Sequence, residues 1–319
     1  MQPTFTPKDP IVDVIGLLRP RSVLPTRLRA AGAWAVRFER FPHVKFGNVV
    51  RGDCWLALEG HEPVLLREGD FYLLGHPPRY VMGSALTVRP RTAKAVWASA
   101  INGAARIGPA RDESNFLCGG QFTFDDPNAP LLLDVLPPLV HVRAGDPRTR
   151  LLAHLSELLV SEVEANAVGS ALALDHLAQL MLVHMLRAHA AQSVRPVGWL
   201  GALGDARIGA ALRAMHANVA HRWTLEELAS IASMSRSAFA ASFKNRVGSA
   251  PLDYLIQWRM NMARDALRHD TRSISELAFA TGYESESAFS TAFRRVVGHS
   301  PKQFRDLSRQ PAPQHTKHA

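Results

Sequence analysis

The chain has 319 residues, 47% of them hydrophobic and 8% aromatic, which excludes a mainly disordered protein and suits two ordinary domains. Its two cysteines are too few for a disulfide framework, and no apolar run approaches the roughly 20 residues that span a bilayer. The formal net charge is +9, which suits a polyanionic partner or serves solubility. The residues from Asp205 onward hold 16 Lys and Arg against 10 Asp and Glu, so the basic excess is concentrated there. Because the N-terminus has no basic region followed by an apolar stretch, we expect a cytosolic chain with no membrane partner.

Residues 33–101 alternate apolar and polar side chains in short runs that Gly and Pro interrupt. Turn signals such as Glu59-Gly60-His61 and Glu68-Gly69-Asp70 separate these runs. Short strands between tight turns are typical of an antiparallel β-sandwich or barrel, which we expect in the N-terminal part of the chain.

From residue 146 the apolar residues adopt helical spacing. Asp146-Pro147 has the pattern of a helix N-cap followed by Pro at the first helical position. The leucines that then fall on one predicted face are Leu151, Leu152, Leu155, Leu158 and Leu159. A second helix is expected from about Ser170 to His189, with an apolar face of Leu177, Leu180, Met181 and His184. Residues 146–195 are therefore predicted to form a helical hairpin and the start of a linker at 192–198, and the leucine stripes would pack on the barrel or join two copies of the chain.

An internal repeat follows, because the segment Thr224–Pro251 recurs as Ser273–Pro301. Corresponding residues lie 49 positions apart before a turn and 50 apart after it, a difference that duplicated structure tolerates best in a turn. Each copy opens with the residues of a capping box, which are Thr224 with Glu227 and Ser273 with Glu276.

Each copy continues as a short helix, a turn at 233–235 or 282–285, and a second helix with two Phe four residues apart. The pairs are Phe239 with Phe243 and Phe289 with Phe293. This spacing buries both rings on one face and leaves the opposite face free. Since basic residues end both second helices, we predict two helix-turn-helix units placed to meet phosphates. A helical bundle with a solvated basic face is the alternative, and the duplication of every feature disfavours it.

Between the copies, Pro251 is expected to begin a helix that runs to about His269. Its apolar stripe comprises Leu252, Leu255, Ile256, Met260, Ala263 and Leu267. We therefore expect one amphipathic linker helix, about 28 Å long at ~1.5 Å per residue, rather than a flexible tether. That length would place the two units in adjacent major-groove segments on one side of a duplex.

The second copy, from Gly282-Tyr283-Glu284-Ser285 through Gly298-His299-Ser300-Pro301, resembles the signature of the AraC/XylS family of bacterial transcription regulators. The resemblance covers Asp205 to about Asp306. The strings that resemble the subgroup with cupin-type sensor domains are Asp205-Ala206-Arg207-Ile208-Gly209 and Trp258-Arg259-Met260, with Gly52, Glu68-Gly69-Asp70 and Phe116-Leu117-Cys118-Gly119 in the N-terminal part. The resemblance implies an α+β chain. It would begin with a cupin-like β-barrel over residues 1–145, followed by the helical hairpin and linker over 146–195. An all-α domain with two helix-turn-helix units joined by a linker helix would then span 199–308, and a disordered tail 309–319.

As a member of this family the protein would bind double-stranded promoter DNA as a homodimer in the bacterial cytoplasm, associate with the nucleoid when bound, and act with RNA polymerase. It would activate transcription in response to a small molecule or a redox signal at the N-terminal domain. By resemblance, the base-reading positions are Ser237, Ala240, Ala241, Glu286, Ser287, Ser290 and Thr291, and the phosphate-contacting candidates are Arg236, Lys244, Asn245, Arg294 and Arg295. Because Ala offers only an apolar surface to a base, direct readout should be weaker in the first helix than in the second.

Two other functions for the barrel stay open. A cupin metalloenzyme fused to a DNA-binding domain would present a His-x-His pair with a downstream Glu and His, whereas His43, His61 and His76 are isolated, so we expect no metal, no cofactor and no catalytic residue. A barrel that only dimerises would make a constitutive regulator, and ligand-binding residues cannot be named because apolar pockets leave no sequence signature. Cys118 lies where some relatives resembling hypochlorite sensors carry a reactive thiol, so Cys118 and Cys54 are redox candidates, with a buried inert role as the alternative.

Overall fold

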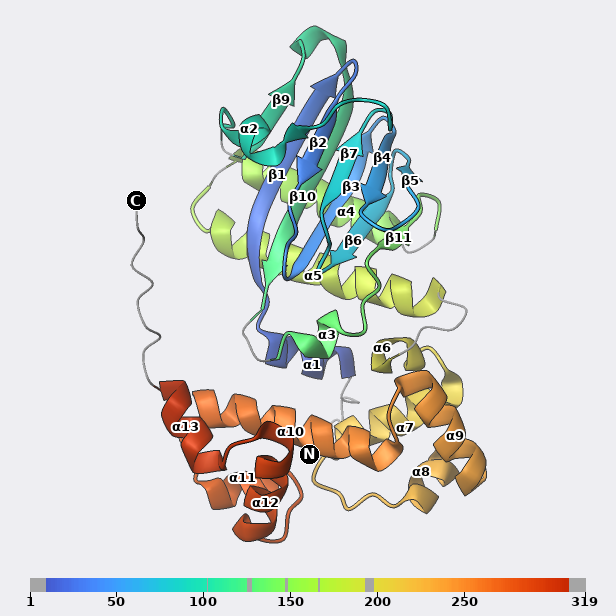
Figure 1. Cartoon of the computed structure of the whole chain (residues 1–319), viewed down its shortest axis with the longest axis vertical. Coiled ribbons are helices and arrows are strands. Elements are labelled where there is room, and N and C mark those ends of the chain that lie inside the picture. The colour runs from blue at the N-terminus through green and yellow to red at the C-terminus, as the bar shows by residue number, and fades with distance from the viewer. Residues whose placement is uncertain are drawn as a thin grey trace, which may run out of the picture. The chain divides into compact units, whose positions relative to one another are not determined.

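The chain folds into two compact units, one of residues 18–194 and one of residues 1–17 together with 195–319 (Figure 1). The computed structural model describes residues 10–101, 103–124, 128–146, 149–165, 167–192 and 198–309. The predicted helix start at Pro147, most of the predicted linker at 192–198 and the predicted tail after Arg309 lie outside these ranges. The N-terminal helix α1 (Pro10–Leu18) is grouped with the helical unit, whereas the sequence assigned residues 1–145 to the barrel.

Two sheets of short strands form the first unit. One sheet has the order β11-β6-β3-β10-β1-β9, with bounds Val140–Val142, Phe71–Gly75, Val44–Arg51, Glu113–Thr123, Arg21–Ala31 and Ala104–Ile107. The other has the order β5-β4-β7-β2-β8, with bounds Val64–Leu66, Cys54–Leu58, Tyr80–Gly83, Ala35–Phe38 and Arg91–Thr92. Neighbouring strands are antiparallel except for β1 with β9 and β2 with β8. The predicted cupin-like barrel of short antiparallel strands is therefore confirmed.

The core of this unit lies between the two sheets, because each strand turns alternate side chains inward. Along β4, Cys54, Leu56 and Leu58 are buried while the residues between them are half-buried. Trp34 is buried in this core, and its indole Nε1 donates to Oδ1 of Asn115 at 3.1 Å. A buried Trp is stable here because its one donor has a partner.

The turn before β6 is fixed by the buried carboxylate of Asp70. It accepts hydrogen bonds from the backbone N–H of Arg67 at 2.9 Å and of Ala144 at 2.7 Å, and from Nε2 of His141 at 2.7 Å. Burial alone would raise the pKa of Asp70, but these hydrogen bonds together hold it below its usual value. The Glu68-Gly69-Asp70 turn therefore joins β6 to the segment around β11.

Two long helices, α4 (Thr149–Ala165) and α5 (Ser170–Gln192), form the predicted hairpin. They pack on each other and on the first sheet, where Ser156 of α4 donates to Asn48 of β3 at 3.1 Å and α5 contacts β1 and β11. Only part of each predicted apolar stripe is covered: Leu152, Leu155, Leu159 and Met181 are buried, but Leu151, Leu158 and Leu180 are exposed. Helix packing buries a narrower stripe than the sequence pattern marks.

Shorter helical segments complete the first unit, and they are α2 (Ala93–Trp97), η1 (Ala110–Asp112) and α3 (Pro130–Leu133). None of the helices in the described ranges is long and apolar enough to cross a membrane.

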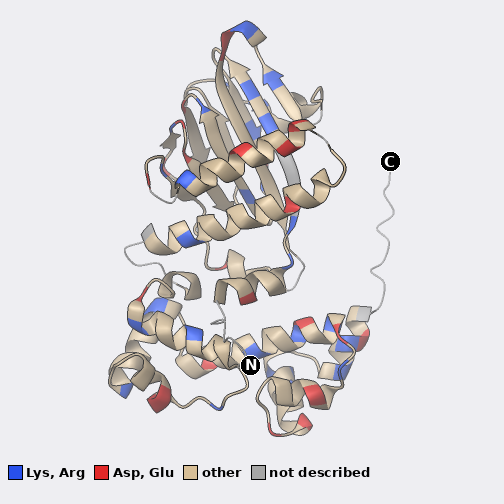
Figure 2. Cartoon of the chain, turned by 180° about the vertical axis from the view of Figure 1, so that it is seen from behind, with Lys and Arg blue, Asp and Glu red and all other residues tan. Residues whose placement is uncertain are grey.

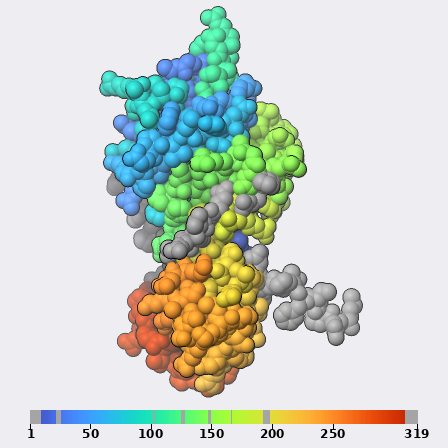
Figure 3. All heavy atoms as spheres, turned by 90° about the vertical axis from the view of Figure 1, so that its right-hand side faces the viewer, coloured from blue at the N-terminus to red at the C-terminus, as the bar shows by residue number. Residues whose placement is uncertain are grey.

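The second unit is helical throughout its described part. After α1 its helices are α6 (Trp199–Ala202), α7 (Ala206–Ala217), α8 (Leu225–Ile231), α9 (Arg236–Val247), α10 (Pro251–His269), α11 (Ile274–Ala280), α12 (Glu286–Val297) and α13 (Pro301–Arg309). In the space-filling view the yellow segment of α6 and α7 and the orange segment of α9 form one closely packed surface (Figure 3).

Helix α1 is tied to this unit by a buried imidazole. Nδ1 of His216 in α7 donates to the carboxylate of Asp13 at 3.1 Å, and its Nε2 lies 2.8 Å from the hydroxyl oxygen of Tyr254 in α10. His216 is only 1% exposed, so both of its ring nitrogens need these partners.

Candidate nucleic-acid interface

The two sequence repeats fold as equivalent helix pairs, α8 with α9 and α11 with α12, and each first helix begins with a complete capping box. Glu227 Oε2 accepts from the backbone N–H of Thr224 at 2.7 Å, and Oγ1 of Thr224 accepts from the N–H of Glu227 at 3.2 Å. Ser273 and Glu276 repeat this arrangement at 2.7 and 3.1 Å. The predicted start of both units is confirmed residue by residue.

The turns differ by one residue yet keep the same geometry. Ser233 and Gly282 occupy the same position, with φ of 52° and 82°, and the next N–H donates back into the first helix in both copies. The second helices then begin after the N-caps Ser235 and Ser285, so the additional residue of the second copy is Glu284. At Gly282 a Cβ would lie 2.5 Å from the carbonyl oxygen of Ala220, which requires glycine for close approach as well as for its backbone conformation.

The Phe pairs anchor both second helices. The rings of Phe239 and Phe243 lie 5.6 Å apart and those of Phe289 and Phe293 5.7 Å apart, and all four side chains are fully buried. Gly248 and Gly298 end the two helices in the left-handed conformation, with φ of 93° and 88°. The face opposite each Phe pair is consequently held in a fixed orientation toward solvent.

All the predicted base-reading positions lie on these solvent-facing sides. Ser237, Ala241, Glu286, Ser287 and Thr291 are exposed, while Ala240 and Ser290 are half-buried. The structure therefore brings together the positions of each helix on one accessible face, and the side chains there are short.

The predicted phosphate-contacting residues are exposed as well, but their charges are not equally available. Arg236 forms an ion pair with Glu226 at 2.9 Å. Within the described residues, Lys244, Arg294 and Arg295 have no ion pair. Figure 2 shows Lys and Arg interspersed with Asp and Glu over the helices of this unit. Basic residues without an ion pair among the described residues thus lie in the last turns of α9 and α12, on the same helices as the predicted reading faces.

The linker helix α10 spans the predicted range, Pro251–His269, and most of its apolar stripe is buried. Leu255, Met260, Ala263 and Leu267 are buried, whereas Leu252 is 40% exposed, so its assignment to the stripe is wrong. Leu252 lies in the first turn of the helix, at the N-terminal end of the stripe, and its side chain stays partly exposed there.

Arg259 of α10 joins the two helix pairs, a role that the sequence analysis did not find. Its Nε donates to the carbonyl oxygen of Val219 at 2.9 Å and its Nη2 to that of His221 at 2.7 Å, both in the segment that precedes α8. Its guanidinium also lies 5.8 Å from the ring of Tyr283, in the turn of the second pair. A buried Arg in an amphipathic helix is the signal that could have indicated it, since such a residue needs fixed acceptors.

Known proteins resemble the chain over nearly its whole length. The family described as "Cupin" matches residues 9–191, and the family described as "Helix-turn-helix domain" matches residues 228–306. An AraC-like transcription regulator of Streptomyces antibioticus is 42% identical over 93% of this chain and 98% of its own length. The chain belongs to the AraC family of transcription regulators.

Two shorter matches fall within this family. The RCS-specific HTH-type transcriptional activator RclR of Escherichia coli K12 is 40% identical over 34% of this chain and 38% of its own length. Among solved structures, the DNA-binding domain of AdpA in complex with a target DNA is 32% identical, covers 34% of this chain and 97% of that chain, and has a TM-score of 0.32. The two family matches, not these shorter ones, give this AraC-type regulator its cupin domain and its DNA-binding helix-turn-helix domain.

The two thiols of this AraC-type regulator are free and buried. Burial raises the pKa of both Cys54 and Cys118 to about 12. At neutral pH a thiol with such a pKa is ionised in only about one molecule in 10⁵, and the thiolate is the species that oxidants attack. The geometry supports the inert alternative for both residues.

The three histidines of the barrel lie in different surroundings. The ring of His43 meets those of Phe41 and Phe124 edge-on at 5.9 Å, and His61 lies on an exposed turn, where its Nδ1 is 3.1 Å from the carbonyl oxygen of Glu59. His76 has a positive φ of 33° just after β6. Within the described ranges, no three His, Cys, Asp or Glu residues gather as a metal ion would require.

Proposed function

We propose that this regulator is a sequence-specific transcriptional activator that inserts α9 and α12 of one chain into successive major-groove segments. The observation that carries the proposal is the pair of equivalent helix-turn-helix units on one linker helix, joined through the buried Arg259. The helix α10 has 19 residues, which span about 28 Å at ~1.5 Å per residue, near the ~34 Å between successive major-groove segments on one face of DNA. One chain would therefore read an asymmetric site of roughly two helical turns.

In this proposal Ser237, Ala240 and Ala241 of α9 and Glu286, Ser287, Ser290 and Thr291 of α12 face base edges. Arg294 and Arg295, with Arg236, Lys244 and Asn245, contact phosphates. The pairing of Arg236 with Glu226 means that this residue exchanges one anionic partner for another on binding, so it should contribute less than the unpaired arginines. Activation is supported by the E. coli relative that is named a transcriptional activator, and we propose that it proceeds through RNA polymerase.

The experiment that tests DNA reading begins with in vitro selection of bound sites by the full chain from a random duplex library. Gel shifts then compare the selected site with versions that carry an insertion of about 5 base pairs between the half-sites, which turns the second half-site by half a helical turn. We expect this insertion to remove most of the specific affinity, and an insertion of about 10 base pairs to remove it too, because the second half-site then lies a further ~34 Å away along the duplex. Undiminished binding to the half-turn variant would contradict the proposal.

For the barrel we propose a sensor of a small molecule, because the first unit contains a cavity of about 380 Å³ lined by both of its sheets. The deep burial of both thiols favours a bound molecule over a redox signal. A metalloenzyme and a barrel that only dimerises are the alternatives. A thermal-shift screen of the full chain separates the sensor from the scaffold, since only a sensor gains stability from a ligand.

We also propose a homodimer formed by the outer side of α4 and α5. Leu151 and Leu158 are 45% and 56% exposed and lie seven residues apart, and Leu172 and Leu180 are 65% and 48% exposed and lie eight apart. Each pair therefore shares one helix face. Sedimentation of the full chain should show a dimer that Leu158→Glu converts to a monomer, whereas Leu86→Glu, an equally exposed leucine elsewhere in the barrel unit, should leave it intact. Unchanged sedimentation of the Leu158 variant would place the dimer interface elsewhere.

A further inference from the structure

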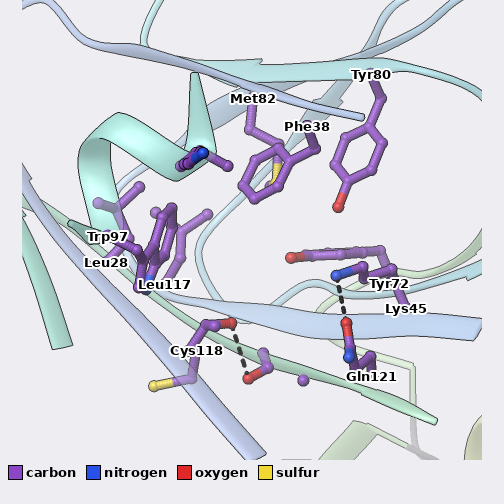
Figure 4. Close-up of a pocket in the computed structure, with 15 residues that line it drawn as sticks. Leu28, Phe38, Lys45, Tyr72, Tyr80, Met82, Trp97, Leu117, Cys118 and Gln121 are labelled. Carbon is purple, nitrogen blue, oxygen red and sulfur yellow. Dashed lines mark hydrogen bonds between the residues drawn. The ribbon is translucent and has the colours of Figure 1, made fainter. Parts of the chain in front are cut away.

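The cavity of the barrel has a largely apolar wall, with polar groups of the strands gathered at one end and Lys94 of α2 also in the lining (Figure 4). It is lined by strands of both sheets and by α2. Its apolar lining is formed mainly by Leu28, Phe38, Met82, Trp97 and Leu117. Phe38 stacks on Tyr80 with ring centroids 4.7 Å apart and an interplanar angle of 9°, and its centroid lies 5.9 Å from that of Trp97. Such a wall is suited to a flat or aliphatic apolar group.

The polar end consists of Lys45 of β3, Tyr72 of β6 and Tyr80 of β7. Lys45 Nζ donates to Oε1 of Gln121 at 2.6 Å and lies 4.5 Å from the ring of Phe41. No carboxylate in the described part of the chain forms an ion pair with it. Burial lowers the pKa of Lys45 and raises that of Tyr72 and of Tyr80. The ammonium therefore stands at an apolar cavity without a counter-ion from the described residues.

Both phenol hydroxyls are available to a ligand. Tyr72 and Tyr80 are 7% and 4% exposed, yet neither hydroxyl has a hydrogen-bond partner among the described residues. In Figure 4 the hydroxyl of Tyr80 points toward Lys45 and Tyr72. Gly47 makes the position of the Tyr72 hydroxyl possible, because a Cβ there would lie 2.5 Å from its oxygen. The Lys45 ammonium, which has Gln121 but no carboxylate as a partner, and the two phenol hydroxyls thus supply three donor groups to one end of the cavity, which suits an anionic acceptor.

We propose that the cavity binds a small aromatic or aliphatic carboxylic acid, whose carboxylate meets Lys45 and the hydroxyls of Tyr72 and Tyr80 and whose apolar part lies against Phe38, Met82 and Trp97. The three groups can all donate to one anion, whereas a cationic ligand would be repelled by Lys45 and a neutral one would leave the ammonium without a counter-ion. The inference deepens the proposed sensor function by naming the class of its ligand.

The test is calorimetric titration of the full chain with benzoate, 4-phenylbutyrate and 2-naphthoate, each beside its primary amide, which has a similar shape and no charge. We expect at least one acid to bind and its amide to bind about ten- to a hundredfold more weakly, as the loss of hydrogen bonds to charged groups implies. Lys45→Met should weaken binding of the acid by the same factor and leave binding of the amide unchanged. Tyr80→Phe, which keeps the aromatic ring in the cavity wall, should weaken binding of the acid about threefold to tenfold. Arg111→Met, at a cation with an 87% exposed side chain, is the matched control and should change nothing.

Three results would overturn the inference: no acid binds, acid and amide bind equally, or the Lys45 variant binds the acid as the wild type does. A thermal melt and a gel shift on the selected DNA site verify that each variant is folded. The two proposals fail separately. If an acid binds through Lys45 but does not change the affinity for DNA, the proposed sensor function is refuted and the carboxylate site stands. If the chain binds DNA normally but binds none of the acids, only the carboxylate site is refuted.

Discussion

Replacing Arg259 should uncouple the two helix-turn-helix units. The side chain donates two hydrogen bonds from a charged group to backbone carbonyls, and such bonds contribute about 1.5–3 kcal/mol each. Arg259→Met, which keeps most of the buried volume, should therefore lower the free energy of unfolding of the helical unit by roughly 3–6 kcal/mol. Arg259→Lys can keep at most one of the two bonds and should lose about half as much.

The effect on DNA binding distinguishes coupling from stability alone. If Arg259 fixes the angle between the units, its removal should weaken the selected two-part site more than a site that keeps only one half-site. The penalty for the half-turn insertion should shrink as well, because a loosened pair adapts to altered spacing. Gel shifts of wild type and variants on the three duplexes, at temperatures where each variant is folded, give this comparison.

Arg222 supplies the control for Arg259. It forms an ion pair with Glu284 at 2.7 Å and so joins the same two segments, but its side chain is 85% exposed and that of Glu284 81%. Exposed pairs contribute little, so Arg222→Ala should cost less than about 1 kcal/mol and leave the spacing penalty unchanged. An unaltered spacing penalty in Arg259→Met, or an equal effect of Arg222→Ala, would refute the coupling role.

Three further predictions concern the reading helices and the barrel. Arg294→Ala and Arg295→Ala should weaken binding to all sequences about equally and reduce the salt slope of log K by about one per lost phosphate contact, and unchanged slopes in filter-binding titrations would remove both residues from the interface. Thr291→Ala and Glu286→Ala should change the bases preferred in repeated in vitro selection, and identical selected sites would mean that another face of α12 reads DNA. Asp70→Asn should lower the unfolding free energy of the barrel by about 2–3 kcal/mol at pH 7. Because the pKa of folded Asp70 lies below its ordinary value of 3.8, this difference in unfolding free energy should persist above that pH and vanish as the pH falls through the folded pKa. A difference that does not change with pH in urea denaturation would contradict a stabilising role of the ionised Asp70 carboxylate.

Local signals in the sequence predicted the helical unit closely. The capping boxes at Thr224 and Ser273, the Phe pairs and the Pro at residue 251 each act over one or two helical turns, and all of them appear in the structure as expected. The strands of the barrel were predicted as a class because alternation and turns are also local. Their order, with β1 between β9 and β10, depends on contacts between residues about 80 to 100 positions apart, which no local pattern encodes.

The remaining differences have the same origin. Leu151 and Leu158 follow the helical period, but whether a leucine at the edge of the stripe is covered depends on the width of the neighbour it meets. The role of Arg259 depends on the carbonyls of Val219 and His221, about 40 residues away. The cavity was invisible for the same reason, since Lys45, Tyr72 and Tyr80 converge only once β3, β6 and β7 are paired in their sheets.

In the proposed mode of binding, the short side chains of the predicted reading faces and the rigid linker act together in selecting DNA. Each bidentate base contact is worth about 1–3 kcal/mol, and Ala240 and Ala241 can make none, so α9 alone should discriminate poorly. Joining two weak readers can raise the overall affinity by about 10²–10⁴, which corresponds to roughly 3–5 kcal/mol, provided that both can engage at once. That gain equals one or two lost bidentate contacts and depends entirely on geometry. A buried arginine that fixes the angle of the pair can therefore matter as much for specificity as any residue that touches a base.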